Sequence, residues 1–185
     1  KDIVDGYILE TFSDLYEIKA AVLAVKENSD KPVFATMTFD GSGRTLTGST
    51  PEIAAYTLEG LGVDAVGVNC SLGPKELQSI VGRFLACCSV PVIVQPNCGL
   101  PVLENGRTVY KLSVEEFYSY IEKFVGMGAA IVGGCCGTTP EFIDAISRLS
   151  GKEVRRPSVA AGTAVCSATR KVEIDGVKIR GERLN

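Results

Sequence analysis

Three of the seven cysteines follow apolar runs that are typical of buried strands. Cys70 ends the run 65–70, and Cys135 and Cys136 follow the run 129–134. The carboxyl ends of parallel strands meet at one edge of a sheet, so we expect these three thiols to lie together there. Glycines on both sides of the pair let the backbone turn so that both sulfurs face one ion. The pattern predicts a metal site made of three thiolates.

The absence of histidine narrows the chemistry of that site. Any metal must be held by sulfur and oxygen, because the chain has no histidine at all. A structural zinc site takes four protein ligands, whereas three leave a position open for a substrate. Three thiolates give a zinc site a net charge of −1, which keeps an added thiolate nucleophilic. A free thiol with a pKa of about 8.5 is only a few per cent ionised at pH 7, and zinc coordination deprotonates it. Alkylation of a thiol substrate therefore fits this site better than hydrolysis.

The cysteines also have a simpler interpretation. A Cys-Cys pair, or a lone cysteine, is often a small residue of the apolar core. The residues alone leave the metal site and this alternative about equally weighted. Cys87, Cys88, Cys98 and Cys166 are expected to be structural. The pair Cys87-Cys88 falls between a helix and the next strand, at the opposite end of the sheet, and serves as an internal comparison.

The elements that position these residues alternate along the chain. Continuous apolar runs predict strands, and the runs are 7–12, 32–39, 65–70, 90–96 and 129–134. Helices lie between them. Their starts are marked by Asp14, by Thr50 and Thr139, each before a proline, and by a capping box of Ser113 with Glu116. The order predicts a parallel α/β array, which an open sheet or the second half of a (β/α)8 barrel would satisfy.

The last part of the chain differs from the rest. Residues 152–157 are polar and charged, 158–169 are rich in alanine and small residues, and 172–179 alternate around Asp175-Gly176, which suggests a small hairpin. We therefore expect one domain over residues 1–150 and a linker over 151–185.

Composition excludes some classes of function. A net charge of −3 argues against a nucleic-acid interface, which would show a basic face. No apolar run is long enough to cross a membrane, so no membrane partner is expected. Seven cysteines among long α/β patterns favour reduced thiols and a cytoplasmic protein over a secreted disulfide scaffold.

Three segments resemble the homocysteine S-methyltransferase family. They are 67–74 (GVNCSLGP), 95–99 (QPNCG) and 133–140 (GGCCGTTP), and the last is the most specific. The resemblance implies a (β/α)8 barrel that binds zinc through Cys70, Cys135 and Cys136. It also implies that this chain holds about strands 4–8 of that barrel, the C-terminal part, because the family barrel begins well before Lys1.

Other segments resemble the cobalamin-dependent branch of the family. These are 39–48 and 104–110, while 181–185 (GERLN) resembles the opening of a methyltetrahydrofolate-binding domain. The resemblance implies homocysteine as substrate and methylcobalamin as methyl donor, with cobalamin held by another module of the same polypeptide. The pterin-binding and cobalamin-binding modules would then be partners of this chain.

The resemblance also suggests residues that contact the substrate. Glu10 and Thr11 end the first strand, and an acid there would meet the ammonium group of homocysteine. Asn97 follows the strand 90–96, and its oxygen is a possible fourth zinc ligand when homocysteine is absent. Apart from the resemblance, the backbone amides of 133–137 lie near an expected helix start and could hold the substrate carboxylate. Asn97 could also be a turn residue and Glu10 a helix-start carboxylate.

Two other functions stay open. A member of the same family can use betaine or S-methylmethionine directly as methyl donor, although the GERLN segment counts against this. A non-enzymatic domain that buffers zinc or redox state through its vicinal thiols is the second alternative.

Overall fold

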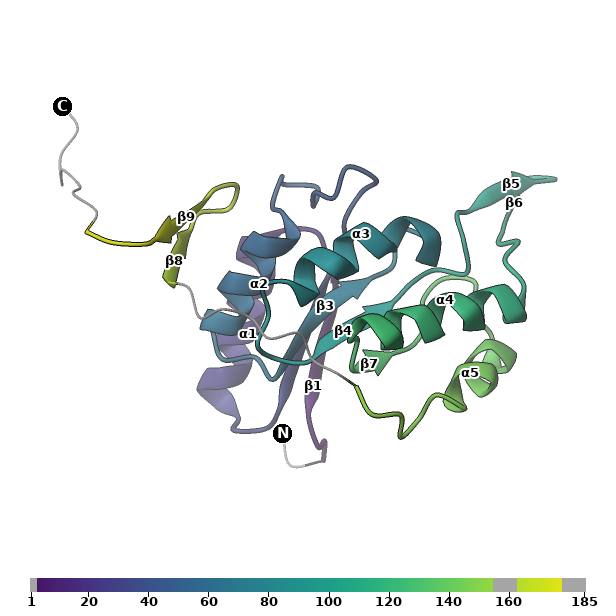
Figure 1. Ribbon diagram of the computed structural model, residues 1–185, viewed down its shortest axis with the longest axis horizontal. Helices are drawn as coiled ribbons and strands as arrows, with labels where there is room; N and C mark the ends of the chain where they lie inside the picture. The colour runs from purple at the N-terminus through teal and green to yellow at the C-terminus, as the bar shows by residue number, and fades with distance from the viewer. Residues whose placement is uncertain (1–2, 155–162, 178–185) are drawn as a thin grey trace.

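The computed structural model describes residues 3–154 and 163–177, and its main feature is an open parallel sheet (Figure 1). The elements are β1 (Tyr7–Phe12), α1 (Leu15–Asn28), β2 (Val33–Met37), α2 (Pro51–Gly60), β3 (Ala65–Asn69), α3 (Pro74–Leu85), β4 (Val92–Gln95), β5 (Val102–Glu104), β6 (Arg107–Val109), α4 (Val114–Met127), β7 (Ile131–Val132), α5 (Pro140–Ser147), β8 (Thr163–Cys166) and β9 (Lys171–Ile174). The sheet order is β1-β2-β3-β4-β7, and every neighbouring pair is parallel. The predicted parallel α/β array is confirmed.

Each of the five expected strands is present, and the three central strands, β2, β3 and β4, are almost wholly buried. The helix starts also agree with their capping residues. The Asp14 carboxylate accepts from the Glu17 N–H at 2.8 Å, and Ser113 and Glu116 form the expected capping box. Thr139 precedes α5 as expected, but its hydroxyl donates to Glu141 instead of accepting from the backbone.

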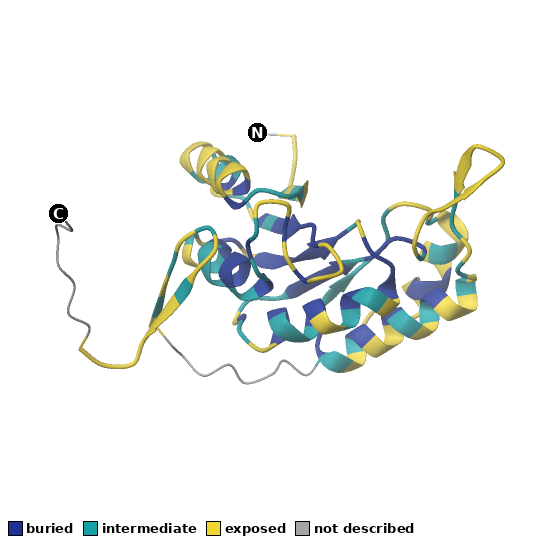
Figure 2. Cartoon of the chain, turned by 90° about the horizontal axis from the view of Figure 1, so that it is seen from above, coloured by how far each residue is buried: buried dark blue, intermediate teal, exposed yellow. Residues whose placement is uncertain are grey.

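The sheet has two different faces. Strand order follows chain order, and right-handed connections then place the helices on one face. Alternate strand residues, such as Met37, Val68 and Val94, pack against those helices in the main core. The other set includes Thr36 and Asn69, which are buried polar residues. Figure 2 shows the central strands as the most buried part of the molecule. Polar chemistry is therefore concentrated on the face that the helices do not cover.

Two small hairpins extend from this body. The arm β5–β6 turns at Asn105-Gly106, whose positive φ angles of 50° and 74° match the turn that this dipeptide favours. The hairpin predicted around Asp175-Gly176 stays a prediction, because residues 178–179 of its second strand lie outside the described residues. Strand β9 pairs antiparallel with the preceding strand β8, and the two are joined by a turn at residues 167–170.

Long-range contacts explain the position of that second hairpin. The Ser49 hydroxyl donates to the Ala168 carbonyl at 2.6 Å, and the Lys171 ammonium lies 4.7 Å from the centre of the Tyr56 ring. The hairpin therefore packs on α2. In the expected linker 151–185, residues 155–162 and 178–185, including the segment 181–185, lie outside the described residues. No described helix is long and apolar enough to span a bilayer.

Candidate metal centre

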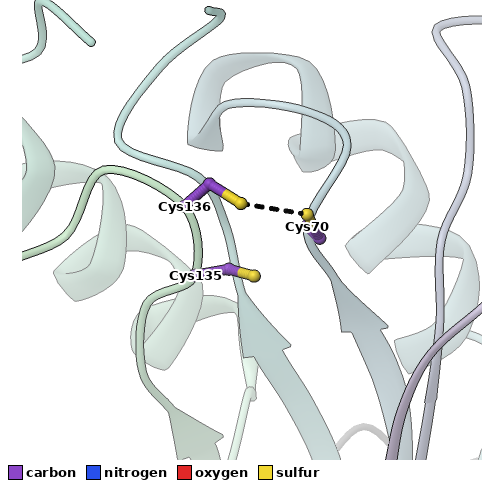
Figure 3. A group of neighbouring side chains, drawn as sticks. All are labelled: Cys70, Cys135 and Cys136. Atoms are coloured by element: carbon purple, nitrogen blue, oxygen red, sulfur yellow. Dashed lines mark hydrogen bonds between the residues drawn. The ribbon is translucent and has the colours of Figure 1, made fainter. Parts of the chain in front are cut away.

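Three thiols converge at the carboxyl edge of the sheet. Cys70 follows β3, and Cys135 and Cys136 follow β7, two strands away in the sheet (Figure 3). All three sulfurs lie within 4.8 Å of one another, and the Cys70 and Cys136 sulfurs are 3.6 Å apart. The structure thus brings together the three cysteines that the sequence singled out, from positions 65 and more residues apart.

The backbone at Cys70 is held in a strained turn. Cys70 and Ser71 both have φ of 60°, in the left-handed region where a side chain costs on the order of 1–3 kcal/mol. The turn is tied down because the Cys70 N–H donates to the Gln95 carbonyl and the Leu72 N–H donates to the Cys70 carbonyl. Strain of this kind persists only where the surroundings enforce it, which makes the turn a functional candidate in its own right.

The Cys135-Cys136 turn is anchored to the loop after β4. The Cys135 N–H donates to the Pro96 carbonyl at 2.8 Å, and the Cys98 N–H donates to the Cys136 carbonyl at 2.8 Å. The Thr138 hydroxyl donates to the Cys135 carbonyl at 2.7 Å. Because their backbones are fixed in this way, the two neighbouring sulfurs both face Cys70.

These contacts also test the idea that the glycine-rich amides bind a carboxylate. The N–H groups of Gly133, Cys135 and Cys136 all donate to acceptors of the protein itself. They are therefore not free for a substrate carboxylate, and that expectation is wrong for these three amides.

Asn97 lies inside the centre. It is buried, and its side-chain oxygen accepts from the Cys136 N–H at 3.1 Å. The same side chain lies against Cys70 and favours the ionised form of that thiol. The structure therefore places Asn97 between the two halves of the sulfur cluster, where it fixes the Cys136 backbone.

Glu10 and Thr11 lie near the carboxyl end of β1, the edge strand of the sheet. The register of β1 shifts between Leu9 and Phe12, and Thr11 has a φ of 67°. This bulge turns the Thr11 N–H toward Asn69. Glu10 is exposed, and in the part of the chain that the structure describes no hydrogen bond or ion pair to it is found. Its carboxylate is available to a ligand.

Asn69 is a residue of the centre that sequence reasoning missed. It is 1% exposed and directly precedes Cys70. Its amide nitrogen lies 3.9 Å from the Cys135 sulfur and donates to the Thr11 hydroxyl. One signal was available in the sequence: a polar residue at the end of a wholly buried strand, next to a candidate ligand.

Tyr110 was missed as well. It follows the arm β5–β6, and its ring packs on Gly137, where an added Cβ would lie 2.4 Å from the ring. Gly137 has a φ of 83°, so glycine is needed there both for space and for backbone conformation. Burial and the neighbouring Cys136 raise the pKa of the Tyr110 hydroxyl. The arm therefore supplies a ring that covers one side of the cysteine turn.

The thiols differ in their electrostatics. Burial opposes ionisation of Cys70, but hydrogen bonds from the Ser71 N–H, the other two cysteines and Asn97 lower the pKa of its thiol. Burial, followed by the proximity of Cys70 and Cys136, raises the pKa of Cys135 to about 12. One thiolate is thus favoured without a metal, and a second needs a cation beside it.

The cluster fits a tetrahedral zinc ion. Zinc–sulfur bonds of about 2.3 Å at tetrahedral angles place the sulfurs about 3.8 Å apart. The Cys70–Cys136 separation is 3.6 Å, and no pair of the three exceeds 4.8 Å. A set of three soft thiolates also suits zinc better than magnesium or calcium, which prefer oxygen ligands.

Comparison with known sequences identifies related proteins. The sequence model of the homocysteine S-methyltransferase family matches residues 1–150. Methionine synthase of Mycobacterium leprae is 36% identical over 185 residues, which are 97% of this chain and 14% of that protein. Methionine synthase of Mycobacterium tuberculosis is 34% identical over 191 residues, 98% of this chain and 16% of that protein. The chain spans only about a seventh of the length of these relatives.

Solved structures with the same fold include a homocysteine methyltransferase, MmuM from Escherichia coli. Its apo form superposes with a TM-score of 0.65 at 22% identity, over 80% of this chain and 50% of the other. Its metallated form gives a TM-score of 0.66 at 23% identity, over 80% of this chain and 46% of the other. Identity at this level supports the fold alone.

Proposed function

Because the chain belongs to the homocysteine S-methyltransferase family, we propose that it is the homocysteine-activating part of a methionine synthase. In this proposal homocysteine accepts a methyl group from methylcobalamin and becomes methionine. The observation that carries the proposal is the cluster of three cysteine sulfurs at the carboxyl edge of a parallel sheet.

The proposed metal ligands are Cys70, Cys135 and Cys136. When bound, zinc would take the homocysteine sulfur as its fourth ligand and keep it as a nucleophilic thiolate. The chain contributes the geometry: the strained turn at Cys70 and the anchored turn after β7 hold the sulfurs at distances that a zinc ion matches. Asn97 fixes the Cys136 backbone, and its oxygen is the proposed fourth ligand before homocysteine binds.

The amino-acid part of homocysteine is assigned to the edge strand β1. Glu10 has an exposed carboxylate without a partner in the described residues, which suits an ammonium group. Thr11 is held by Asn69, so its position is coupled to the sulfur cluster. The hydrogen bonds of Asn69 would then link the two parts of the substrate site, the cysteine cluster that binds the thiol and strand β1 that binds the ammonium group.

The fold belongs in the same proposal. We assign residues 1–150 to about strands 4–8 of a (β/α)8 barrel and 151–185 to a linker toward a pterin-binding domain. The open edges at β1 and β7, and the match to about half of a related structure, support this assignment. The cobalamin-binding and pterin-binding modules are then partners within the same polypeptide. A site of three reduced thiols further suits the cytoplasm.

Binding of homocysteine tests this function directly. Calorimetry of the zinc-loaded chain in buffers of different ionisation enthalpy should show release of about one proton per homocysteine, because the thiol binds as thiolate. Homoserine, which has a hydroxyl in place of the thiol, is the matched ligand and should not bind. Binding without proton release, or equal binding after zinc removal, would contradict the proposal.

The methyl donor is tested separately. Methylcobalamin supplied in solution should yield methionine with the zinc-loaded chain, whereas betaine and S-methylmethionine should not. Turnover with either of those two donors would identify the direct-donor alternative. Stable zinc binding with no response to homocysteine would favour the zinc-buffering or redox alternative.

A further inference from the structure

The side chain of Asn69 uses its full hydrogen-bonding capacity. Its oxygen accepts from the Thr11 N–H at 2.8 Å and from the Thr36 hydroxyl at 2.8 Å. Its nitrogen donates to the Thr11 hydroxyl at 2.7 Å and lies 3.9 Å from the Cys135 sulfur. A carboxamide has two acceptor sites and two donor hydrogens, so all four are engaged. Such complete use is expected of a buried residue that must hold one orientation.

The orientation of this amide follows from its partners. A backbone N–H can only donate, so the atom facing the Thr11 N–H must be the amide oxygen. The nitrogen must then be the atom that faces Cys135, and its hydrogen points at the sulfur. The cysteine therefore receives a donor, whichever way the Thr36 hydroxyl rotates.

We propose that Asn69 is a positioning residue that donates a hydrogen bond to the Cys135 thiolate and ties Thr11 to the metal centre. This inference rests on the proposed zinc site. Three thiolates around Zn²⁺ leave a net charge of −1, and a thiolate substrate makes it −2. A donor beside one sulfur offsets part of that charge and fixes the ligand, as outer partners of metal ligands commonly do.

The proposal explains why asparagine, and not aspartate, stands at this position. Aspartate has the same shape and would keep both contacts of the oxygen. Its second oxygen, however, would face the Cys135 sulfur and bring a negative charge against a thiolate. That substitution therefore converts an attraction into a repulsion with little change in volume.

Cobalt provides the probe, because Co²⁺ occupies zinc sites and its thiolate ligands give a charge-transfer absorption. The chain is compared with Asn69→Asp and with Asn69→Ala, which removes the donor without adding charge. Asn105→Asp is the matched control for charge, since Asn105 is exposed at the tip of the arm. Thr36→Val is the structural control, because it removes a partner of the same amide on its oxygen side.

We expect Asn69→Ala to weaken cobalt binding and to move the charge-transfer band to lower energy, with a larger effect in Asn69→Asp. The loss in affinity should be about 10–100-fold, the range typical of outer partners of metal ligands. Thr36→Val should lower the melting temperature and leave the band in place, and Asn105→Asp should change neither.

Two results would overturn the inference. Asn69→Ala and Asn69→Asp could keep the band and affinity of the unaltered chain, or Thr36→Val could shift the band as much as they do. The second result would reduce Asn69 to a structural role. If Asn69→Asp does not fold, Asn69→Ala decides. Failure of the unaltered chain to give any thiolate–cobalt band would instead overturn the proposed zinc site itself, and this inference with it.

Discussion

The same dipeptide, Cys-Cys, occurs at both ends of the sheet with opposite surroundings. Cys135-Cys136 follows strand β7 in a glycine-rich turn, with Cys70 opposite. Cys87-Cys88 continues the end of α3, where the Cys88 N–H donates to the Phe84 carbonyl. Cys88 is only 6% exposed and packs in the core. Within residues 3–154 and 163–177, a third thiol meets only the first pair.

The comparison shows that position in the fold, and not the dipeptide, brings a third thiol to a cysteine pair. The pKa of Cys88 is raised by its hydrogen bond to Cys87 and by burial, and burial raises that of Cys135 as well. High thiol pKa values are thus common to both ends. A thiol of lowered pKa is also present at both ends, Cys70 at one and Cys87 at the other. The difference is the third sulfur, which lies within 4.8 Å of the other two only at the end that receives Cys70, among the described residues.

Removal of one thiol at each end gives the largest expected contrast. Cys135→Ser should weaken zinc binding by more than about 100-fold, beyond the range for outer partners of a metal ligand. Cys88→Ser should leave affinity unchanged and lower the free energy of unfolding by about 1–3 kcal/mol, because it buries a hydroxyl. Competition with a chelating dye and thermal melts measure the two effects.

Two results would contradict this distinction between the cysteine pairs. If Cys135→Ser retained full zinc affinity, the turn after β7 would be no metal site. If Cys88→Ser lost zinc while remaining folded, the second pair would have a ligand role that its surroundings do not indicate.

Gly137, directly after the Cys135-Cys136 pair, tests whether the backbone of this turn is sterically constrained. Gly137→Ala should cost about 2 kcal/mol, because the residue has a φ of 83° and the new Cβ would overlap the Tyr110 ring. Gly126→Ala is the matched control in α4, where nothing lies within 4 Å of the added Cβ. It should stabilise the chain by about 0.5–1 kcal/mol, and denaturant unfolding measures both. Equal effects would show that the cysteine turn is not under steric control.

Thiol alkylation should separate the cysteines by pH in the metal-free chain. The thiolate is the reactive form, so Cys70, with its lowered pKa, should react at lower pH than an ordinary cysteine. Cys135, with a pKa of about 12, should react roughly 1,000-fold more slowly than a free thiol at pH 7 and accelerate as pH rises toward 12. Peptide mapping by mass spectrometry measures the extent of alkylation at each cysteine.

Zinc provides the control for that experiment. It should protect Cys70, Cys135 and Cys136 and leave Cys87 unchanged. Protection of Cys87 by zinc would contradict the distinction between the two ends.

A smaller effect concerns the ion pair beside Cys87, whose thiol donates to the Arg83 carbonyl. Arg83 binds the Glu52 carboxylate through two bonds of 2.6 and 2.7 Å, which lower the pKa of Glu52 to about 2. A depressed pKa gives stability above the ordinary value of about 4.5 that is lost as pH falls through 2. Glu52→Gln should cost about 1 kcal/mol at pH 7 after solvent screening, and only a small part of that cost should remain near pH 2.

Thermal melts from pH 7 to 2, with and without a chelator, measure that difference. The chelator should not alter it, because the ion pair is not part of the metal centre. A difference that stays constant down to pH 2 would remove the ion pair as its cause.

The sequence predicted most of the sheet because its strands are continuous apolar runs, and the central strands β2, β3 and β4 are buried on both faces. It did not predict the β8–β9 hairpin, because that hairpin is held by contacts of Ala168 with Ser49 and of Lys171 with Tyr56 of α2. Local pattern cannot supply contacts over such distances along the chain.

The clustering of Cys70, Cys135 and Cys136 was also predictable, because each follows a strand and such positions share one edge of the sheet. The sequence does not identify Asn69 and Tyr110 as site residues, although both lie in segments that resemble the family. Asn69 acts across 58 and 66 residues to Thr11 and Cys135, and Tyr110 packs on Gly137 from a separate arm. Their roles depend on geometry that spacing in one sequence does not encode.

X-ray absorption at the zinc edge tests the central claim most directly. The zinc-loaded chain should show three sulfur neighbours and one lighter neighbour at bond lengths typical of zinc. Addition of homocysteine should replace the lighter neighbour and give four sulfurs. A first shell with fewer than three sulfurs, or one that homocysteine leaves unchanged, would contradict the account.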